Sequence, residues 1–157
     1  MFGEMRREGQ QLSTEDCEAI LNRGTSGVLA VSDDGDYPYA VPLSYCYDGG
    51  KIYFHCAKTG HKLDAIEKNN KASFCVIDAD DVVPEKFTTY YKSVVVFGRI
   101  QIISGGDEKF KAITALSEKY SPGDKNTQRE IEQSWERFCM LELEIEHMTG
   151  KAAKELV

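Results

Sequence analysis

The sequence predicts a mainly β fold in which six antiparallel strands close into a barrel with flanking helices. Three observations predict it. Six short segments are apolar or alternate between apolar and polar residues, and tight turns join most of them. Helical patterns interrupt this succession only after the third strand and before the last. A doubly wound parallel sheet would need a helix between nearly every pair of strands, so an antiparallel barrel fits better.

The first elements are a helix and a hairpin. Ser13 is a good N-cap for a helix that Gly24 ends. Residues 26–32 (SGVLAVS) have the composition of a buried strand. The turn residues Asp33–Asp36 lead into a second strand over 37–47. Two strands around such a turn predict a β-hairpin.

The strand over 37–47 contains a proline in its interior. One face takes Tyr37, Tyr39, Val41, Leu43, Tyr45 and Tyr47, and the other takes Pro38, Ala40, Pro42, Ser44 and Cys46. Proline lacks a backbone N–H, so Pro42 belongs at an edge or an interruption of the sheet. Backbone groups near it are then free for other partners. The turn Asp48-Gly49-Gly50 leads into a third strand over 51–57.

The rest of the chain alternates between helices and strands. We expect helices over 61–69, 107–119 and 126–137, strands over 72–78, 89–103 and 138–146, and a polar loop over 79–88. The last strand alternates cleanly. Cys139, Leu141, Leu143 and Ile145 should face the core, and Glu142, Glu144 and Glu146 should face water.

Length and charge limit the possible functions. The 157 residues predict one domain over 1–157, with its core at about 12–149. The net charge of −7 argues against nucleic acid or a membrane surface as a partner. There is no apolar run of the ~20 residues that a membrane helix needs, and no signal peptide. The five cysteines are scattered, which is typical of a reduced cytoplasmic protein.

The charge is unevenly distributed. Residues 51–71 contain five lysines and two carboxylates, a local charge of +3. The rest of the chain contains 14 basic and 24 acidic residues, a charge of −10. A basic segment on an acidic protein is a candidate anion site. The exclusion of anionic partners therefore holds for polymers but not for one small anion.

The centre of this basic segment is Thr59-Gly60-His61-Lys62, at a junction between a strand and a helix. The free N–H groups and dipole at a helix N-terminus favour a phosphate there. Gly60 permits close approach of the backbone, and Thr59, His61 and Lys62 offer hydrogen bonds. In the alternative interpretation, Thr59 merely caps the helix and the lysines are ordinary surface residues.

Two chemically active residues precede this junction on opposite faces of their strand. His55 either lines a ligand pocket or is a strand histidine with local hydrogen bonds, and Cys56 follows the apolar face. We predict no metal site from these residues and His61, because the spacing of structural zinc ligands is missing. The chain contains no G-x-S-x-G, no Walker loop and no G-x-G-x-x-G motif.

Several longer motifs together resemble a known family. VPLSYCYDGGKIYFHCAKTGHKLDAI (41–66), ASFCVID (72–78), PEKFTTYYKSVVVFGRI (84–100) and EKYSP (118–122) resemble the nitroimidazole-resistance (Nim-type) proteins. These belong to the pyridoxamine 5'-phosphate oxidase-like flavoprotein superfamily. The resemblance covers about residues 5–151. It implies a six-stranded antiparallel split β-barrel that binds FMN at a homodimer interface.

The resemblance also implies which residues contact the cofactor. His61 and Lys62 fall where the family holds the FMN phosphate, with Gly60 in place of a hydroxyl residue and Thr59 one position earlier. His55 and Cys56 fall on the strand along the flavin ring. The neighbouring strand, whose backbone commonly bonds the flavin edge, contributes Val41, Pro42, Leu43 and Ser44. Histidine in place of arginine at position 61 adds charge only when it is protonated.

The resulting hypothesis is a homodimeric, FMN-dependent oxidoreductase. It would reduce a small electron-poor compound, such as a nitroaromatic, with electrons from an unidentified donor, and His55 is the candidate catalytic residue. The C-terminal basic extension of true pyridoxamine-phosphate oxidases is missing, so we do not expect oxidation of vitamin B6. Two alternatives remain open. One is a non-catalytic store or sensor for flavin or haem, with His55, His61 or His147 as axial ligand. The other is a partner-binding module with a vestigial pocket.

Overall fold

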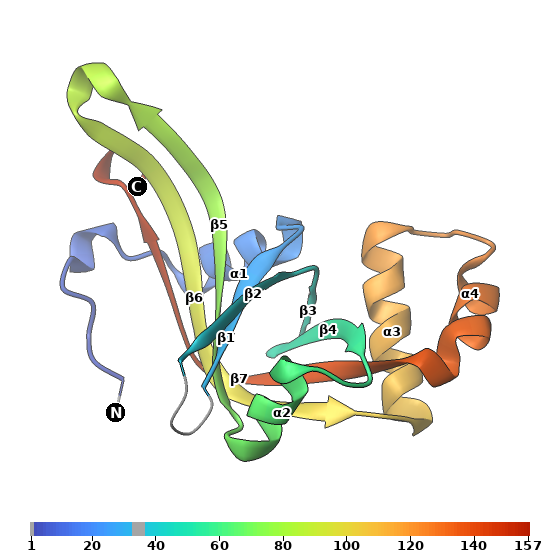
Figure 1. Ribbon diagram of the computed structural model, residues 1–157. Coiled ribbons are helices and arrows are strands. Elements are labelled where there is room, and N and C mark those ends of the chain that lie inside the picture. The colour runs from blue at the N-terminus through green and yellow to red at the C-terminus, as the bar shows by residue number, and fades with distance from the viewer. Residues whose placement is uncertain (1, 33–36) are drawn as a thin grey trace.

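The computed structural model describes residues 2–32 and 37–157, which form one antiparallel sheet with helices around it (Figure 1). The order of strands is β2-β1-β5-β6-β7-β4-β3. The strands are β1 (Gly27–Val31), β2 (Tyr39–Leu43), β3 (Cys46–Asp48), β4 (Lys51–Ala57), β5 (Lys71–Val83), β6 (Thr88–Ile103) and β7 (Phe138–Ala152). The helices are α1 (Thr14–Arg23), α2 (His61–Lys68), α3 (Gly106–Tyr120) and α4 (Thr127–Ser134). Short 3₁₀ turns occupy Glu8–Gln10, Pro84–Lys86, Trp135–Arg137 and Lys154–Leu156.

The strand expected over 37–47 is two strands, which makes seven strands in the described residues instead of six. Alternation holds through β2, where Tyr39, Val41 and Leu43 pack against the core. It continues through Tyr45 and Tyr47, which pack in the same apolar cluster, while Cys46 is buried in a different one. No strand is assigned at residues 44–45, and we call this break between β2 and β3 the bend. The expected turn at Asp33–Asp36 lies outside the described residues.

The two edges of the sheet meet at this bend. β2 and β3 are the edge strands, yet only residues 44–45 separate them in the chain. Because consecutive Cα atoms are ~3.8 Å apart, the end of β2 must lie close to the start of β3. The sheet is therefore strongly curled. Its strand ladders in the described residues do not join β2 to β3, so closure into a barrel stays a prediction.

The loop expected over 79–88 is mostly strand. β5 continues to Val83 and pairs with β6, with Asp80 opposite Tyr91. A register shift between Ile77 and Ala79 marks a bulge where the extension begins. The resulting β5–β6 hairpin projects beyond the body of the protein (Figure 1). The hydrogen bonds of the ladder thus hold a polar segment that has no apolar alternation of its own.

Two apolar clusters flank strands β4 and β7. The larger lies between the curled sheet and α1 and includes Phe54, Phe74 and Leu141. The smaller, between these strands and the pair α3–α4, includes Phe138 and Met140. The first six residues of β7 are therefore all buried. Part of β7 is a central strand covered on both faces, and not one face of an open sheet.

Glu142 departs from the predicted alternation, because it is buried while Glu144 and Glu146 are exposed as expected. Its carboxylate lies 3.4 Å from the Lys51 ammonium and accepts a hydrogen bond of 3.1 Å from Gln101. A buried carboxylate requires such partners. In the described part of the chain, no helix is long and apolar enough to cross a bilayer.

Candidate functional site

The N-terminus of α2 has no side-chain cap. Gly60 is the N-cap residue, and its φ of 144° is one that residues with a side chain rarely adopt. A Cβ at this position would meet nothing within 4 Å, so the space beside it is open. The first helical hydrogen bond runs from the Asp64 N–H to the Gly60 carbonyl, at 3.2 Å. The interpretation of Thr59 as a simple cap is therefore wrong.

The N–H groups of residues 61–63 point out of this helix end, as in the first turn of any α-helix. No backbone hydrogen bond from them is found in residues 2–32 and 37–157. Together with the helix dipole, they form a local site of positive potential. This end of α2 can hold a phosphate or carboxylate with its backbone alone.

Two lysines of the basic segment are already neutralised. Lys51 pairs with Glu142, and the Lys58 ammonium lies 3.6 Å from a carboxylate oxygen of Glu136. Lys62, in the first turn of α2, is half-buried and has no ion pair among the described residues. The net charge of +3 therefore overstates the positive potential of the segment. Lys62 is the lysine best placed to meet an anion at the helix end.

A ring contact joins this helix end to the strand that contains the predicted flavin-edge residues. The rings of His61 and Tyr39 lie edge to face, with centroids 4.9 Å apart. Tyr39 begins β2, an edge strand whose one strand partner in residues 2–32 and 37–157 is β1. The other backbone edge of β2 therefore has unpaired N–H and C=O groups. Pro42 and Ser44 have exposed side chains, whereas Val41 and Leu43 pack towards the core.

His55 lies near the same helix end, on the α3–α4 side of β4. Its ring packs on Phe138, with centroids 4.9 Å apart. The pKa of His55 is below its usual value, first because the surroundings exclude water and then because Lys109 and Lys62 repel a proton. The imidazole is therefore neutral at pH 7, and it reaches solvent.

Lys109 is a buried lysine close enough to His55 to lower its pKa, and sequence reasoning did not single it out. It is 1% exposed, and its ammonium donates a 2.5 Å hydrogen bond to the Trp135 carbonyl. The same ammonium lies over the rings of Trp135 and Phe138, 4.3 and 4.1 Å from their centroids. Burial lowers its pKa, but the carbonyl and the two rings partly compensate the cation. The sequence did contain a signal, because Lys109 occupies a position of the predicted helix 107–119 that faces the core.

Cys56 does not belong to this group, although the resemblance implied it. Its side chain points into the larger core, is 5% exposed, and lies on the face of β4 opposite His55. Only its backbone can meet a ligand on the His55 side. The structure thus brings together His55, Lys62 and the end of α2, with β2 alongside through His61, and separates the Cys56 thiol from them.

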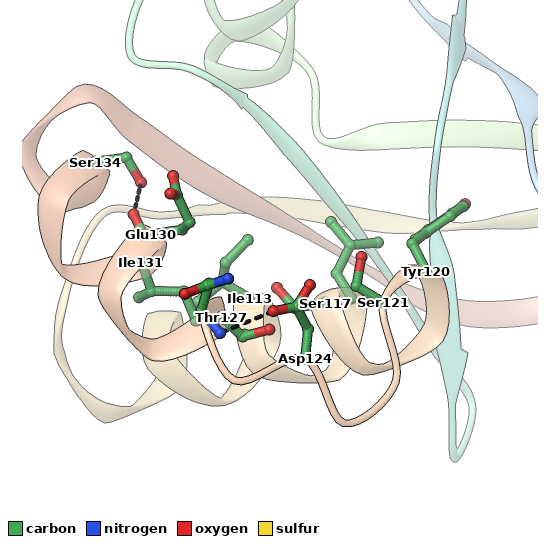
Figure 2. Close-up of a pocket in the computed structure, with 11 residues that line it drawn as sticks. Ile113, Ser117, Tyr120, Ser121, Asp124, Thr127, Glu130, Ile131 and Ser134 are labelled. Carbon is green, nitrogen blue, oxygen red and sulfur yellow. Dashed lines mark hydrogen bonds between the residues drawn. The ribbon is translucent and has the colours of Figure 1, made fainter.

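Sequence reasoning also missed a cavity of about 350 Å³ between α3 and α4 (Figure 2). Its wall combines apolar residues, such as Ile113 and Leu116, with polar ones, such as Ser117, Asp124 and Glu130. Figure 2 shows Asp124 and Thr127 near one another on the loop side, and the Ser134 hydroxyl bonded to the Glu130 carbonyl. None of the predicted site residues lines it.

One face of the sheet is apolar and open. Cross-strand pairing places Pro42, Val28, Cys75, Val95 and Thr149 in one row over five strands. Val28 is 40%, Ile77 65% and Phe97 36% exposed on this face. We call the row and these residues the outer sheet face. An apolar surface over five strands is a candidate for a protein interface.

Comparison with known proteins gives a family and a fold. Residues 13–152 match the family model described as pyridoxamine 5'-phosphate oxidase. No curated protein matches the chain significantly.

Three solved structures illustrate the likeness in fold. A candidate 5-nitroimidazole antibiotic resistance protein of Bacteroides thetaiotaomicron has a TM-score of 0.77 at 18% identity, over 90% of this chain and 85% of that one. A flavocytochrome of Azotobacter vinelandii has a TM-score of 0.78 at 20% identity, over 96% and 72%. An FAD and heme binding protein of Mycobacterium smegmatis has a TM-score of 0.77 at 21% identity, over 93% and 74%. At these identities the likeness shows a shared fold, and nothing of the ligand.

Proposed function

This chain belongs to the pyridoxamine 5'-phosphate oxidase family, and from that premise we propose that it is an FMN-dependent oxidoreductase. The observation that best supports the proposal is the uncapped N-terminus of α2. Gly60 leaves space there, Lys62 supplies a charge that no carboxylate of the described residues pairs with, and the edge strand β2 lies alongside. These features fit a flavin phosphate and the ring that follows it.

The phosphate would be held mainly by this chain's backbone. N–H groups in the first turn of α2 would donate to its oxygens, and the Lys62 ammonium would add a charge-assisted hydrogen bond. The His61 imidazole can add a hydrogen bond from a ring N–H. Thr59, exposed and free of a capping role, can offer its hydroxyl to the same group.

A bound flavin would supply the hydride or electron transfer, and the protein would supply orientation and a proton. The unpaired backbone edge of β2 at Val41–Ser44 would orient the ring edge by hydrogen bonds. His55 is the candidate catalytic residue. Because its pKa is lowered, it is neutral at pH 7 and can accept a proton, or donate one from its ring N–H through a relay.

The outer sheet face supports a homodimer. A second copy could bury Val28, Ile77 and Phe97. Each Å² of apolar surface buried in this way would stabilise the dimer by ~25 cal/mol. Ile77→Lys should then shift the mass in light scattering from dimer to monomer. Val82→Lys is a matched control, because Val82 is equally exposed, at 68%, but lies on the projecting hairpin. A monomeric wild-type protein would contradict the dimer.

The substrate we propose is a small electron-poor compound, such as a nitroaromatic, reduced in the cytoplasm with electrons from an unidentified donor. The motifs shared with Nim-type proteins and the fold of the Bacteroides protein support this choice. Loss of the nitro absorbance under anaerobic conditions measures the activity directly. His55→Ala should lower the rate and change its pH profile without lowering the affinity for FMN.

A store or sensor that binds flavin or haem is the second candidate. The fold shared with a flavocytochrome and with an FAD and heme binding protein favours it. Of the histidines considered as axial ligands, His147 is stacked against the Phe2 ring, with centroids 4.6 Å apart. Absorption of the purified protein separates the candidates. Haem gives one intense band near ~400 nm, and flavin gives two, at ~370 and ~450 nm.

The phosphate site is tested by titrating FMN into Lys62→Ala and following flavin fluorescence. Loss of one charge-assisted hydrogen bond costs ~1.5–3 kcal/mol, which weakens binding about 10- to 150-fold. Lys71→Ala is the control, since Lys71 belongs to the same basic segment but lies at the start of β5. Equal affinities in the two variants would contradict the placement, and uptake of neither cofactor would contradict both candidates.

A further inference from the structure

Two cysteines lie opposite one another on neighbouring strands. Cys56 of β4 is the direct partner of Cys139 of β7 in the antiparallel ladder, and their sulfur atoms are 3.3 Å apart. Directly opposed residues in such a ladder have Cα atoms ~4.5–5.5 Å apart. A disulfide needs Cα atoms within ~4.4–6.8 Å. The backbone is therefore already within the range for a disulfide.

No other pair of cysteines has this relation. All five cysteines are free thiols, and among the described residues only these two sulfurs contact one another. Cys17 belongs to α1 and Cys46 to the other apolar cluster, while Cys75 lies on the outer sheet face. Five cysteines allow ten different disulfides. Oxidation of the native protein should therefore form only the one between Cys56 and Cys139.

The position in the ladder gives a small oxidant access. Only one residue pair of the β4–β7 ladder, Ala57–Phe138, lies beyond the pair Cys56–Cys139, because β4 ends and β7 begins there. We call each such pair of opposed residues a rung. The Cys139 thiol also lies 3.5 Å from the carbonyl of Ala57, which is exposed. Rungs at the end of a ladder open at low free-energy cost. A molecule as small as hydrogen peroxide can reach these thiols during such opening.

We propose that Cys56 and Cys139 form a dithiol–disulfide site oxidised by peroxide. The sulfur of Cys56, the more exposed of the two, attacks one peroxide oxygen; the O–O bond breaks, one water leaves, and Cys56 becomes a sulfenic acid. The sulfur of Cys139 then attacks the Cys56 sulfur, the S–O bond breaks, and a second water leaves. Two thiols and one peroxide give one disulfide and two waters. The sulfurs lose the two electrons that the peroxide oxygens gain.

The reaction should be slow at neutral pH. Burial and the neighbouring thiol raise the pKa of Cys56 well above its usual value, so little thiolate is present. The rate should therefore rise steeply with pH from 7 to 10. Such a site responds to sustained oxidation and not to a brief pulse.

The disulfide would act on His55 through the backbone. His55 precedes Cys56 in β4 and is paired with Met140, the residue after Cys139. A bond between the two strands removes the opening of the last rungs and holds His55 against Phe138. The site itself does not depend on bound flavin, so its test stands apart from the proposed function.

The test is oxidation of the native full-length protein with hydrogen peroxide, followed by unfolding and thiol titration. The count should fall from five to three and return to five with dithiothreitol. Trypsin cleaves after Lys51, Lys58, Arg137 and Lys151, so each cysteine lies in its own peptide, 52–58 or 138–151. Mass spectrometry should find these two peptides linked, with the loss of two hydrogens.

Variants add a second readout. Cys139→Ala should leave a sulfenic acid on Cys56 that dimedone traps, and no disulfide. Cys46→Ala, which changes a thiol that is equally buried, should leave the disulfide intact. A count that stays at five in the oxidised wild-type protein would overturn the proposal. So would a disulfide between any other pair, and neither result requires a variant to fold.

Discussion

Replacing Tyr120 by phenylalanine should destabilise the bend between β2 and β3. The Tyr120 hydroxyl accepts a hydrogen bond of 3.0 Å from the Tyr45 N–H and donates one of 2.6 Å to the Thr25 carbonyl. Tyr45 is fully buried. The variant keeps the ring but leaves a donor and an acceptor without this partner, at the place where the two edges of the sheet meet.

The size of the effect follows from the burial of these groups. An unsatisfied buried donor costs ~1–3 kcal/mol, while the exposed Thr25 carbonyl can turn to water at little cost. With ~2–4 °C per kcal/mol for a protein of this size, the melting temperature should fall by about 4–8 °C at the middle of that range. The affinity for FMN should fall too, because residues Val41–Ser44 lead directly into the bend.

Thermal unfolding followed by far-ultraviolet circular dichroism measures the change. Tyr90→Phe is a matched control, since the Tyr90 hydroxyl only accepts a hydrogen bond from Lys86 at an exposed position. Its melting temperature should change by less than about 2 °C, because interactions at exposed positions contribute little to the free energy of unfolding. Equal melting temperatures for the two variants would refute the assignment of Tyr120 as the support of this bend.

Two further predictions concern the buried Lys109 and Gly98, which lies at the register shift between β6 and β7. Lys109→Met should raise the pKa of His55 by removing a neighbouring charge, measured from the imidazole C–H signals in NMR. The pKa of His55 in the folded protein lies below its value of ~6.5 in the unfolded chain. The free energy of unfolding of the wild-type protein should therefore fall as the pH drops through ~6.5, and that of the variant should fall less. Gly98→Ala should unfold the protein or cost more than ~3 kcal/mol in urea, because a Cβ there overlaps the Glu144 carbonyl. Gly105→Ala has open space around it but replaces the N-cap of α3, so it should cost only ~1 kcal/mol, and similar costs for both glycines would contradict this.

Elements with strong local signals were predicted well. The strand 51–57 has the predicted bounds, because a tight turn precedes it and the junction with α2 follows. The helix predicted from residue 61 begins at His61, where Gly60 provides the backbone conformation. In these places the residues that decide the structure are neighbours in the chain.

Elements that depend on partners in other strands were not predicted well. The polar residues Asp80 and Asp81 predict a loop, yet pairing with Tyr91 and Tyr90 makes them part of β5. Glu142 has the alternation of a solvent-facing residue, yet α3 and α4 cover its face of β7 and Lys51 neutralises it. In both cases the deciding partner lies on another strand, and the alternation within one strand does not reveal it.

The candidate site divides in the same way. The sequence by itself determined the family resemblance, the excess of lysine over residues 51–71 and the glycine that opens the end of α2. The tertiary structure decided that Lys51 and Lys58 are neutralised, because their partners Glu142 and Glu136 lie far along the chain, on and just before β7. It also placed Cys56 opposite Cys139, whereas alternation along the strand already put Cys56 on the other face from His55. Local conformation is determined by adjacent residues, whereas charge pairing and burial depend on which strands become neighbours in the folded sheet.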